Sequence, residues 1–297
     1  MKKISVFLLV AFVSLSSLAQ KGRNFIYIFD CTYSMKTNGI WESSLEYLRK
    51  GIDCKKEGDK ITIQPFKDKI KEYDPITFDK TDCNWNDLKN TLEDILHDKA
   101  PHTDICKAWE KGMQYIDKNR YNYVYLLTDG QHEYGNREDD VCAFIQQWCE
   151  NHKDTRAFYV MLHKTAENVK ILEAIKNCPD FDVLLPGEHR IPFVFDKNEI
   201  RINARDKDAI AKMHTDCGDE VALSINQNDP YFTLSLRDGC IRDGYGYFTI
   251  KPKKNLDEIN KEVGDEYIFD INLSCSSADY VIAHPNLRVV VSNKTEQ

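Results

Sequence analysis

The sequence predicts an α/β protein in two parts: a doubly wound, mostly parallel sheet over residues 22–187, then an all-β sandwich over residues 190–297. Two apolar runs, Phe25–Phe29 and Tyr123–Leu127, have the composition of strands that are buried on both faces. Segments with apolar residues at helical spacing lie between the strands of the first part. After Pro186-Gly187 the pattern changes to short β-like runs that are separated by turn residues.

The first part alternates strands and helices. The expected strands are Phe25–Asp30, Lys60–Phe66, Ile70–Phe78, Tyr123–Thr128, Ala157–Leu162 and Phe181–Leu185. The expected helices run through Trp41–Ile52, Trp85–Leu96, Ile105–Asp117, Val141–Cys149 and Ala166–Lys176. The second and third strands contain Lys and Pro residues and are joined by a turn, so we expect an antiparallel hairpin at the edge of the sheet. Asn84 is the expected N-cap of the second helix.

The second part reads as a series of short strands. The candidates are Ile191–Phe195, Glu199–Asn203, Glu220–Asn226, Tyr231–Leu236, Gly246–Ile250, Glu266–Leu273, Tyr280–Ala283 and Leu287–Val291. Asp238-Gly239, Asp243-Gly244 and Gly264-Asp265 mark turns between them. The short run Asp208–Met213 is expected to form a single helical turn. Strands at this spacing indicate an immunoglobulin-like sandwich.

The first residues have the character of a secretory leader. Lys2 and Lys3 precede the apolar run Ile4–Leu15, and small residues place a cleavage point between Ala19 and Gln20, so residues 1–19 are the expected signal peptide. A membrane anchor is the alternative, but the run is short for a span. We therefore expect an exported bacterial protein, located in the periplasm or at the cell exterior, with no membrane span in the mature chain.

The charge of the chain argues against some partners. The 297 residues carry a formal net charge of −8. An acidic chain is not suited to binding nucleic acid or an anionic membrane as its main partner. The sequence does not indicate an oligomeric state.

Ten cysteines give an even number, which permits disulfides in an exported protein. Cys217 and Cys240 fall in the same region and are expected to be able to link two strands. Cys142 and Cys149 share one helix face but are too far apart to bond to each other. The alternative is that several cysteines are buried as small apolar residues. Because no C-x-x-C motif is present, neither a thioredoxin-like site nor a zinc ribbon is supported.

A cluster of oxygen-bearing side chains follows the first strand. Asp30 ends the apolar run, and the hydroxyls of Thr32 and Ser34 follow at alternate positions. In open α/β sheets, ligands bind at the carboxyl ends of the strands. An all-oxygen set suits a hard cation such as Mg²⁺. The alternative is a plain helix N-cap, for which Asp, Thr and Ser are all favourable.

Two further segments strengthen the metal interpretation. His102-Thr103-Asp104 opens a predicted helix, and Thr128-Asp129-Gly130 ends the strand from Tyr123. An Asp-x-Thr-x-Ser strand end, a Thr at a helix start and a strand ending Thr-Asp-Gly, in this order, resemble the von Willebrand factor type A domain. The resemblance covers roughly residues 22–185, and the order of predicted elements, with its antiparallel edge strand, is similar to that of the family.

The resemblance implies a metal-ion-dependent adhesion site and its residues. These are Asp30, Thr32, Ser34, Thr103 and Asp129. The implied cofactor is Mg²⁺ or Mn²⁺, and the implied partner is a protein that offers an Asp or Glu carboxylate to the ion. Thr32 stands where the family more often has Ser, and Pro101-His102 replaces glycines before Thr103. His102 could flank the ligand, although an exposed loop residue is the simpler interpretation.

Enzyme chemistry finds less support. Asp30 could serve as an aspartyl nucleophile of a phosphatase, but Thr32 stands where such an enzyme carries its acid–base carboxylate. His132-Glu133 lacks the second His of a zincin, and neither G-x-S-x-G nor a P-loop is present. The acidic residues near Asp129 could form a second cation site or an acidic rim, but a solvated loop leading into a helix is favoured. They are Glu133, Glu138, Asp139 and Asp140.

The resulting hypothesis is a non-enzymatic, metal-dependent protein-binding and adhesion module of the cell envelope. The alternative is a structural component of an envelope assembly, in which the metal site is vestigial and the second part makes the contacts.

Overall fold

The computed structural model describes most of the two predicted parts. The described residues are 22–67, 73–98, 102–151, 155–163, 166–176, 178, 181–184, 190–191, 193–195, 199–203, 208–215, 220–225, 228–270, 273–275, 281–282 and 286–292. The expected leader over residues 1–19, the boundary at Pro186-Gly187 and Cys217 lie outside them. In the described part of the chain, no helix is both long enough and apolar enough to cross a membrane.

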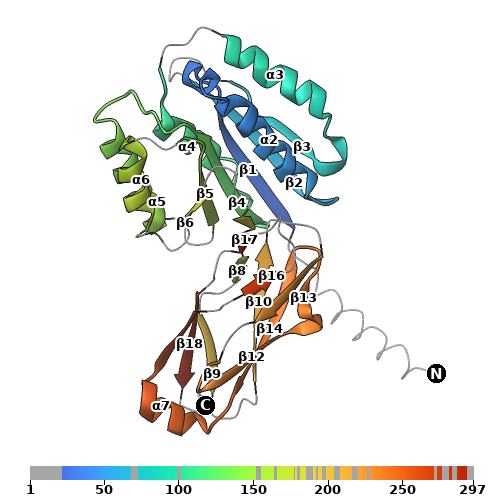
Figure 1. Ribbon diagram of the computed structural model, residues 1–297, viewed down its shortest axis with the longest axis vertical. Coiled ribbons are helices and arrows are strands. Elements are labelled where there is room, and N and C mark those ends of the chain that lie inside the picture. Colours follow the sequence, from blue (N-terminus) through green and yellow to red (C-terminus); the bar gives the residue numbers. More distant parts are fainter. Residues whose placement is uncertain are drawn as a thin grey trace, which may run out of the picture.

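The first part contains a six-stranded sheet with the order β3-β2-β1-β4-β5-β6 (Figure 1). Its strands are β1 (Arg23–Asp30), β2 (Lys60–Phe66), β3 (Ile76–Asp79), β4 (Tyr121–Thr128), β5 (Thr155–Met161) and β6 (Phe181–Leu184). All neighbours are parallel except β2 and β3, which pair antiparallel. This confirms the predicted doubly wound sheet with an antiparallel edge strand. The edge strand is shorter than predicted, because residues 73–75 are not in a strand and residues 70–72 lie outside the description.

Helices cover both faces of this sheet. One face packs α2 (Ile40–Asp53) and α3 (Trp85–His97), and the other packs α4 (Ile105–Met113), α5 (Glu138–Asn151) and α6 (Ala166–Lys176). All eight residues of β1 are buried, as expected for a strand in the middle of a sheet that is covered on both sides. The predicted cap is confirmed, since the Asn84 side chain accepts hydrogen bonds from the backbone N–H groups of Asn86 and Asp87.

The helix α4 ends earlier than the sequence predicts. It was expected to reach Asp117 and stops at Met113. The segment that follows is instead held by side chains from the start of the sheet. Asn24 donates to the carbonyl of Tyr115 at 2.9 Å, and the Asn122 side chain accepts from the N–H of Asp117 at 2.9 Å. These contacts turn the chain into β4 and compete with further helical hydrogen bonds.

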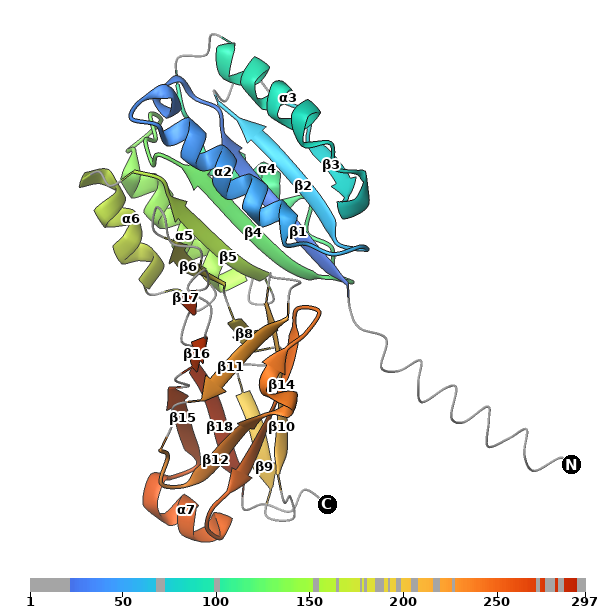
Figure 2. The ribbon, with the colours of Figure 1, turned by 45° about the vertical axis from the view of Figure 1, so that its right-hand side comes forward.

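The second part is built mainly from strands in four small sheets (Figure 2). They are β7 (Arg190–Ile191), β8 (Phe193–Phe195), β9 (Glu199–Asn203), β10 (Ala209–Thr215), β11 (Val221–Ile225), β12 (Phe232–Leu236), β13 (Cys240–Ile241), β14 (Tyr245–Pro252), β15 (Glu266–Asp270), β16 (Leu273–Cys275), β17 (Val281–Ile282) and β18 (Asn286–Ser292). A helix, α7 (Leu256–Val263), and two buried residues of it, Leu256 and Ile259, add to a core that the strands share. The sequence analysis did not anticipate this helix.

One prediction for the second part is wrong. The run Asp208–Met213 was expected to form a helical turn, but residues from Ala209 onward form β10, which lies between β14 and β8 in a four-stranded sheet. Ala211 and Met213 are buried, whereas Ile210 is 54% exposed. The side chains therefore alternate between two faces with the period of a strand.

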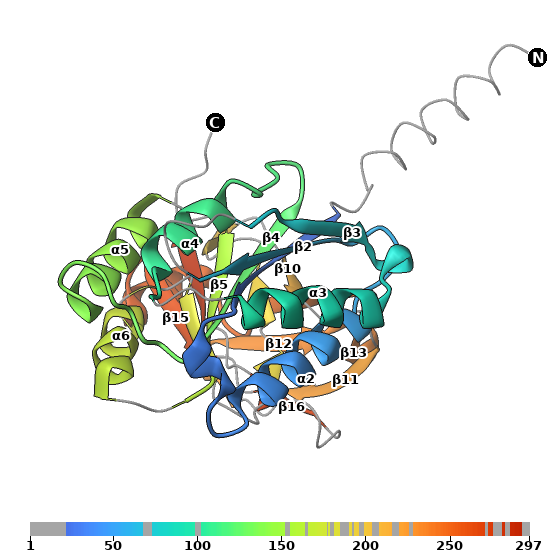
Figure 3. The ribbon, with the colours of Figure 1, turned by 90° about the horizontal axis from the view of Figure 1, so that it is seen from above.

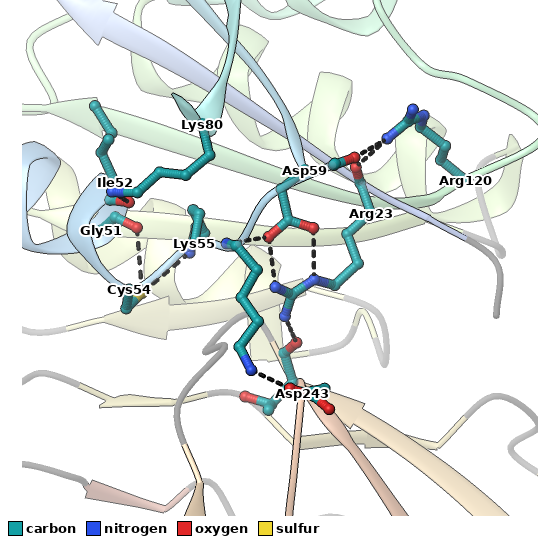
Figure 4. Close-up of polar contacts among 12 residues, drawn as sticks. Arg23, Gly51, Ile52, Cys54, Lys55, Asp59, Lys80, Arg120 and Asp243 are labelled. Carbon is teal, nitrogen blue, oxygen red and sulfur yellow. Dashed lines mark hydrogen bonds and ion pairs between the residues drawn. The ribbon is translucent and has the colours of Figure 1, made fainter. Parts of the chain in front are cut away.

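The two parts meet at the amino end of β1 (Figure 4). Arg23 there is 2% exposed and forms a two-pronged ion pair with Asp59, with Nε···Oδ1 at 2.9 Å and Nη2···Oδ2 at 2.5 Å. Its remaining nitrogen, Nη1, donates to the carbonyl of Thr215 in β10 at 3.1 Å. Lys56 pairs with Asp243 across the same junction. The second part is thus attached at the edge of the sheet where β1 begins.

A further cation completes the junction. Lys212 of β10 donates to the Tyr121 hydroxyl at 3.2 Å and lies 4.5 Å from the centre of the Tyr245 ring. Burial alone would lower the pKa of Arg23, but the hydrogen bonds and negative charge of Asp59 raise it overall. Arg23 therefore carries its positive charge at the junction.

One disulfide links Cys149, in the last turn of α5, to Cys178, just before β6. The Cα atoms are 5.7 Å apart, the usual separation for such a bond. The predicted link between Cys217 and Cys240 is not formed, because Cys240 is a free thiol in a two-residue strand that pairs with β11. Cys142 is not bonded to Cys149, as their separation along α5 requires.

Candidate metal centre

The candidate site lies at the carboxyl ends of β1 and β4, at the edge of the sheet away from the second part (Figure 3). The strands are parallel neighbours in which Phe29 pairs with Leu127. Asp30 therefore stands level with Thr128, and Asp129 follows directly after Thr128 at the same edge of the sheet. Parallel strands place their carboxyl ends at one edge of a sheet, which is where open α/β sheets bind ligands.

The first loop gathers the predicted hydroxyls near Asp30. The N–H of Thr32 donates to Asp30 Oδ1 at 2.8 Å, which turns the chain sharply after β1. The hydroxyls of Thr32 and Ser34 are then 3.0 Å apart. A short 3-10 helix, η1 (Tyr33–Lys36), follows and fixes this turn. The loop brings one carboxylate and two hydroxyls into a single small region.

Thr128 belongs to the site, although the sequence analysis did not select it. Its hydroxyl donates to Asp30 Oδ2 at 2.6 Å and accepts the N–H of Gly130 at 3.1 Å. Thr128 thereby ties the end of β4 to the carboxylate at the end of β1. The available sequence signal was a hydroxyl residue directly before Asp129, at the same level as Asp30 in a parallel pair.

Thr103 is held in place by the loop that follows β4. Its N–H donates to Glu133 Oε2 at 3.1 Å, and its carbonyl accepts the N–H of Glu133 at 3.0 Å. One turn further on, the N–H of Ile105 donates to His132 Nδ1 at 3.1 Å. Thr103 itself stands before α4, whose N-cap is Asp104. The second and third predicted loops are therefore joined by direct hydrogen bonds.

This arrangement changes the interpretation of the acidic residues after Asp129. Glu133 is not simply part of a solvated loop, because it binds Thr103 and lies 3.5 Å from the exposed ring of His102. Asp140 accepts the N–H of Asn136, and Asp139 pairs with Lys170 of α6 at 3.3 Å. The Glu138 side chain lies outside the described part of the chain. Glu133, Asp139 and Asp140 thus each contact a different residue.

The electrostatics of the site are dominated by two buried carboxylates. Asp30 is fully buried and Asp129 is 2% exposed. Burial, together with the negative charge of Asp129, raises the pKa of Asp30 to about 7, against the opposing effect of its hydrogen bonds with Thr128 and Thr32. Burial and the charges of Asp129 and Asp30 also raise the pKa of the Tyr159 hydroxyl on β5. The two carboxylates therefore concentrate negative charge in a region with little access to water.

The donor set fits a hard divalent cation. Two carboxylates and the hydroxyls of Thr32, Ser34 and Thr103 offer oxygen ligands only, the type that Mg²⁺ and Mn²⁺ accept. Among the described residues, no group of three or more His, Cys, Asp and Glu side chains is gathered for a metal. The candidate set consists of two carboxylates and three hydroxyls, so it is not a group of that kind. A cation at this position would offset the repulsion between Asp30 and Asp129.

Comparisons with known proteins give distant likenesses only. No protein-family model matches the chain, and no curated protein matches it significantly. Among solved structures, the chain is similar to proximal thread matrix protein 1 from the mussel byssus, with 15% identity, a TM-score of 0.37, and coverage of 55% of this chain and 41% of that one. It is also similar to the pilus adhesin SpaC from Lactobacillus rhamnosus GG in its open conformation, with 8% identity, a TM-score of 0.43, and coverage of 91% and 43%.

A third likeness is to a von Willebrand factor type A protein from Catenulispora acidiphila, with 13% identity, a TM-score of 0.41, and coverage of 91% of this chain and 66% of that one. The chain spans less than half the length of the byssus protein and of the adhesin. At these TM-scores the likenesses carry no argument about function. The von Willebrand type A-like architecture is instead supported by the observed strand order with its one antiparallel edge strand.

Proposed function

We propose that this protein is a protein-binding module of the bacterial cell envelope or exterior that binds a carboxylate of its partner through Mg²⁺ or Mn²⁺. The observation that carries the proposal is the pair of buried carboxylates, Asp30 and Asp129, at the ends of adjacent parallel strands, together with the hydroxyls of Thr32 and Ser34 in the loop after β1. The residues proposed to hold the ion are Asp30, Thr32, Ser34, Thr103 and Asp129. Bound there, the ion supplies positive charge and a coordination position that an outside carboxylate can take.

Two residues outside the proposed ligand set, Thr128 and Glu133, support the ligands. Thr128 and the N–H of Thr32 hold the Asp30 carboxylate in one orientation. Glu133 holds Thr103 at the mouth of the site. Two carboxylates and three neutral hydroxyls supply about five oxygen ligands, so an octahedral cation keeps one coordination position for an oxygen from outside the protein. Binding is proposed in preference to hydrolysis, because Thr32 occupies the position in which an aspartyl phosphatase needs a proton donor.

The test is thermal unfolding of the protein in EDTA and then in Mg²⁺ or Mn²⁺, with isothermal titration calorimetry of the metal alone. A metal at about 100 times its Kd stabilises the folded state by roughly 2.7 kcal/mol. We expect a metal-dependent rise in the unfolding temperature that is lost in Asp30→Asn and Asp129→Asn. The matched control is Asp139→Asn, which removes an exposed carboxylate that pairs with Lys170. If titration shows no binding and the unfolding temperature does not change, the proposal is wrong and the vestigial-site alternative gains support.

A further inference from the structure

We infer that the protein recognises a second feature of its partner beside the metal site: an aromatic or apolar side chain followed by an additional acidic group. This inference rests on the proposed function and specifies the partner as an acidic protein segment with a large apolar residue. The receiving surface is the η1 rim, which we define as Tyr33, Lys36 and His97.

The η1 rim begins with an unusually exposed aromatic residue. Tyr33 is 71% exposed, more than any other large hydrophobic residue in the described part of the chain. It stands between Thr32 and Ser34, two of the residues proposed to hold the ion. Tyrosine is favoured in binding surfaces because its ring offers a large apolar contact area at a small cost in side-chain entropy. Because Tyr33 lies between two of the proposed ligands, a partner segment that reaches the ion comes close to this residue.

The second component is the exposed ammonium group of Lys36. The Lys36 ammonium lies 5.2 Å from the centre of the Tyr33 ring and donates to His97 Nδ1 at 3.1 Å. Neither of these two contacts of Lys36 is with a carboxylate. Lys36 is exposed, so its positive charge is accessible although the chain as a whole carries a net charge of −8. Its charge complements an acidic group on a partner.

The rim is built on a rigid base. Lys67, which is 2% exposed, donates from Nζ to the carbonyls of Leu96 at 3.0 Å and Asp98 at 2.5 Å. These carbonyls flank His97 at the end of α3, where a cation is favourable for the helix dipole. The buried lysine therefore fixes the end of α3, and with it the ring to which Lys36 donates. Lys36 is positioned by these contacts while its charge remains accessible.

The charges on the two sides of the site determine the direction in which the partner segment extends. The described side chains around Thr103 include the carboxylate of Glu133, and the nearby His102 already lies 3.5 Å from it. A second acidic group is repelled from Glu133 and attracted toward Lys36. The partner segment should therefore extend from the ion over Tyr33 toward Lys36 and His97.

The experiment is selection of random nine-residue peptides displayed on phage against the full chain in Mg²⁺, with parallel selections in EDTA and on Asp30→Asn. Enriched peptides are then synthesised and titrated onto the parent protein, Tyr33→Ala and Lys36→Gln, each saturated with Mg²⁺ as judged by its own thermal shift. Ile268→Ala and Lys251→Gln, on exposed positions of the second part, are the matched controls. Tyr33 and Lys36 are both exposed, so their substitution is not expected to prevent folding.

We expect enriched peptides to combine acidic residues with an aromatic or large apolar residue, and to bind Tyr33→Ala and Lys36→Gln about tenfold or more weakly, as for anchors of an interface. Peptides that require Mg²⁺ but bind the rim variants as well as the parent would overturn the inference and leave the proposed function standing. Peptides that are enriched equally in EDTA and on Asp30→Asn, or no enrichment at all, would count against both.

Discussion

The hydrogen bond between Thr128 and Asp30 determines the geometry of the candidate site at the level of single residues. It joins two strands that are 98 positions apart in the chain, and it orients one of the two buried carboxylates. The same hydroxyl accepts from Gly130, so it also shapes the turn that carries Asp129. Loss of the Thr128 hydroxyl should therefore weaken metal binding, although Thr128 is not itself a proposed ligand.

Thr128→Val tests this role with a side chain of nearly the same shape. The substitution leaves Asp30 Oδ2 and the N–H of Gly130 without their hydroxyl partner, which should cost roughly 1–3 kcal/mol of folding free energy. We also expect weaker Mn²⁺ binding in isothermal titration calorimetry. Thr233→Val, on an exposed strand position, is the control and should match the parent protein. Parent-like metal affinity in Thr128→Val would show that Asp30 does not need this orientation.

The second prediction concerns pH and the buried Asp30. Its pKa in the folded protein is raised above the model-peptide value of 3.8 to about 7, because burial and the charge of Asp129 disfavour the ionised form. The folded state therefore binds the proton more tightly than the unfolded state does. This contribution to stability is fully present below about pH 4 and is lost as the pH rises toward 7.

Urea unfolding in EDTA at pH 5 and pH 8 measures this effect. We expect the parent protein to lose on the order of a few kcal/mol more stability over this interval than Asp30→Asn, because only the parent must ionise the buried carboxyl. Added Mg²⁺ should remove most of the difference at pH 8, since the cation favours the ionised form. An identical pH dependence in parent and variant would place the Asp30 carboxylate in a more polar environment than we describe.

At the level of secondary-structure elements, the loop after β4 holds the amino end of α4. The paired backbone and side-chain hydrogen bonds between Glu133 and Thr103 span 30 positions. His132 adds a bond to Ile105, and the carbonyl of Lys67 accepts from Asp104 at 3.3 Å. The start of this helix is therefore set by three partners outside the helix, and Thr103 is placed by them and not by helix geometry alone.

Glu133→Ala and Glu133→Gln separate the two functions of this side chain. Alanine removes the oxygen that accepts from Thr103, whereas glutamine keeps an acceptor oxygen and removes the charge. We expect Glu133→Ala to weaken Mn²⁺ binding by roughly tenfold, as for loss of one supporting contact at a metal site, and Glu133→Gln to retain most of it. If calorimetry shows the two variants to be equally weak, the charge of Glu133 matters and its hydrogen bond does not.

The difference between local patterns and contacts between distant residues explains what could be predicted from the sequence. Apolar periodicity located the strands and helices of the first part, because buried strands and amphipathic helices each have a characteristic spacing of apolar residues. It failed for β10, whose alternation of Ala211 and Met213 with Ile210 is brief and whose alanine content favours a helix until β8 and β14 pair with it. Thr128 and Glu133 were missed because their partners lie far along the chain.

At the scale of the whole molecule, one buried ion pair connects the two parts. Arg23 binds Asp59 within the first part and the carbonyl of Thr215 in the second. Arg120 also donates to the carbonyls of Arg23 and Gly58, so the start of β1 is held from several sides (Figure 4). A buried pair of this type is sensitive to the loss of either member, since the remaining charge has no water to replace its partner.

Arg23→Ala should therefore destabilise the protein by roughly 3–5 kcal/mol. The four tryptophans, Trp41, Trp85, Trp109 and Trp148, all belong to the first part, so their fluorescence in urea reports on that part. We expect Arg23→Ala with Asp59→Ala to cost less than the sum of the single changes, because the double variant leaves no uncompensated charge. Lys254→Gln, which breaks an exposed pair with Glu262, should leave the midpoint unchanged. Additive costs would mean that Arg23 and Asp59 act independently.

The course of β1 also has a mechanical consequence. This strand begins at the junction with the second part and ends at Asp30, and it pairs in parallel with β2 on one side and β4 on the other (Figure 2). A pull exerted by a partner at Asp30, resisted by the second part through Arg23, runs along the strand. Because both points of load lie on β1, force in this direction is carried by the covalent backbone of that strand. The hydrogen bonds from β1 to β2 and β4 do not have to break for such a load to pass between the two parts.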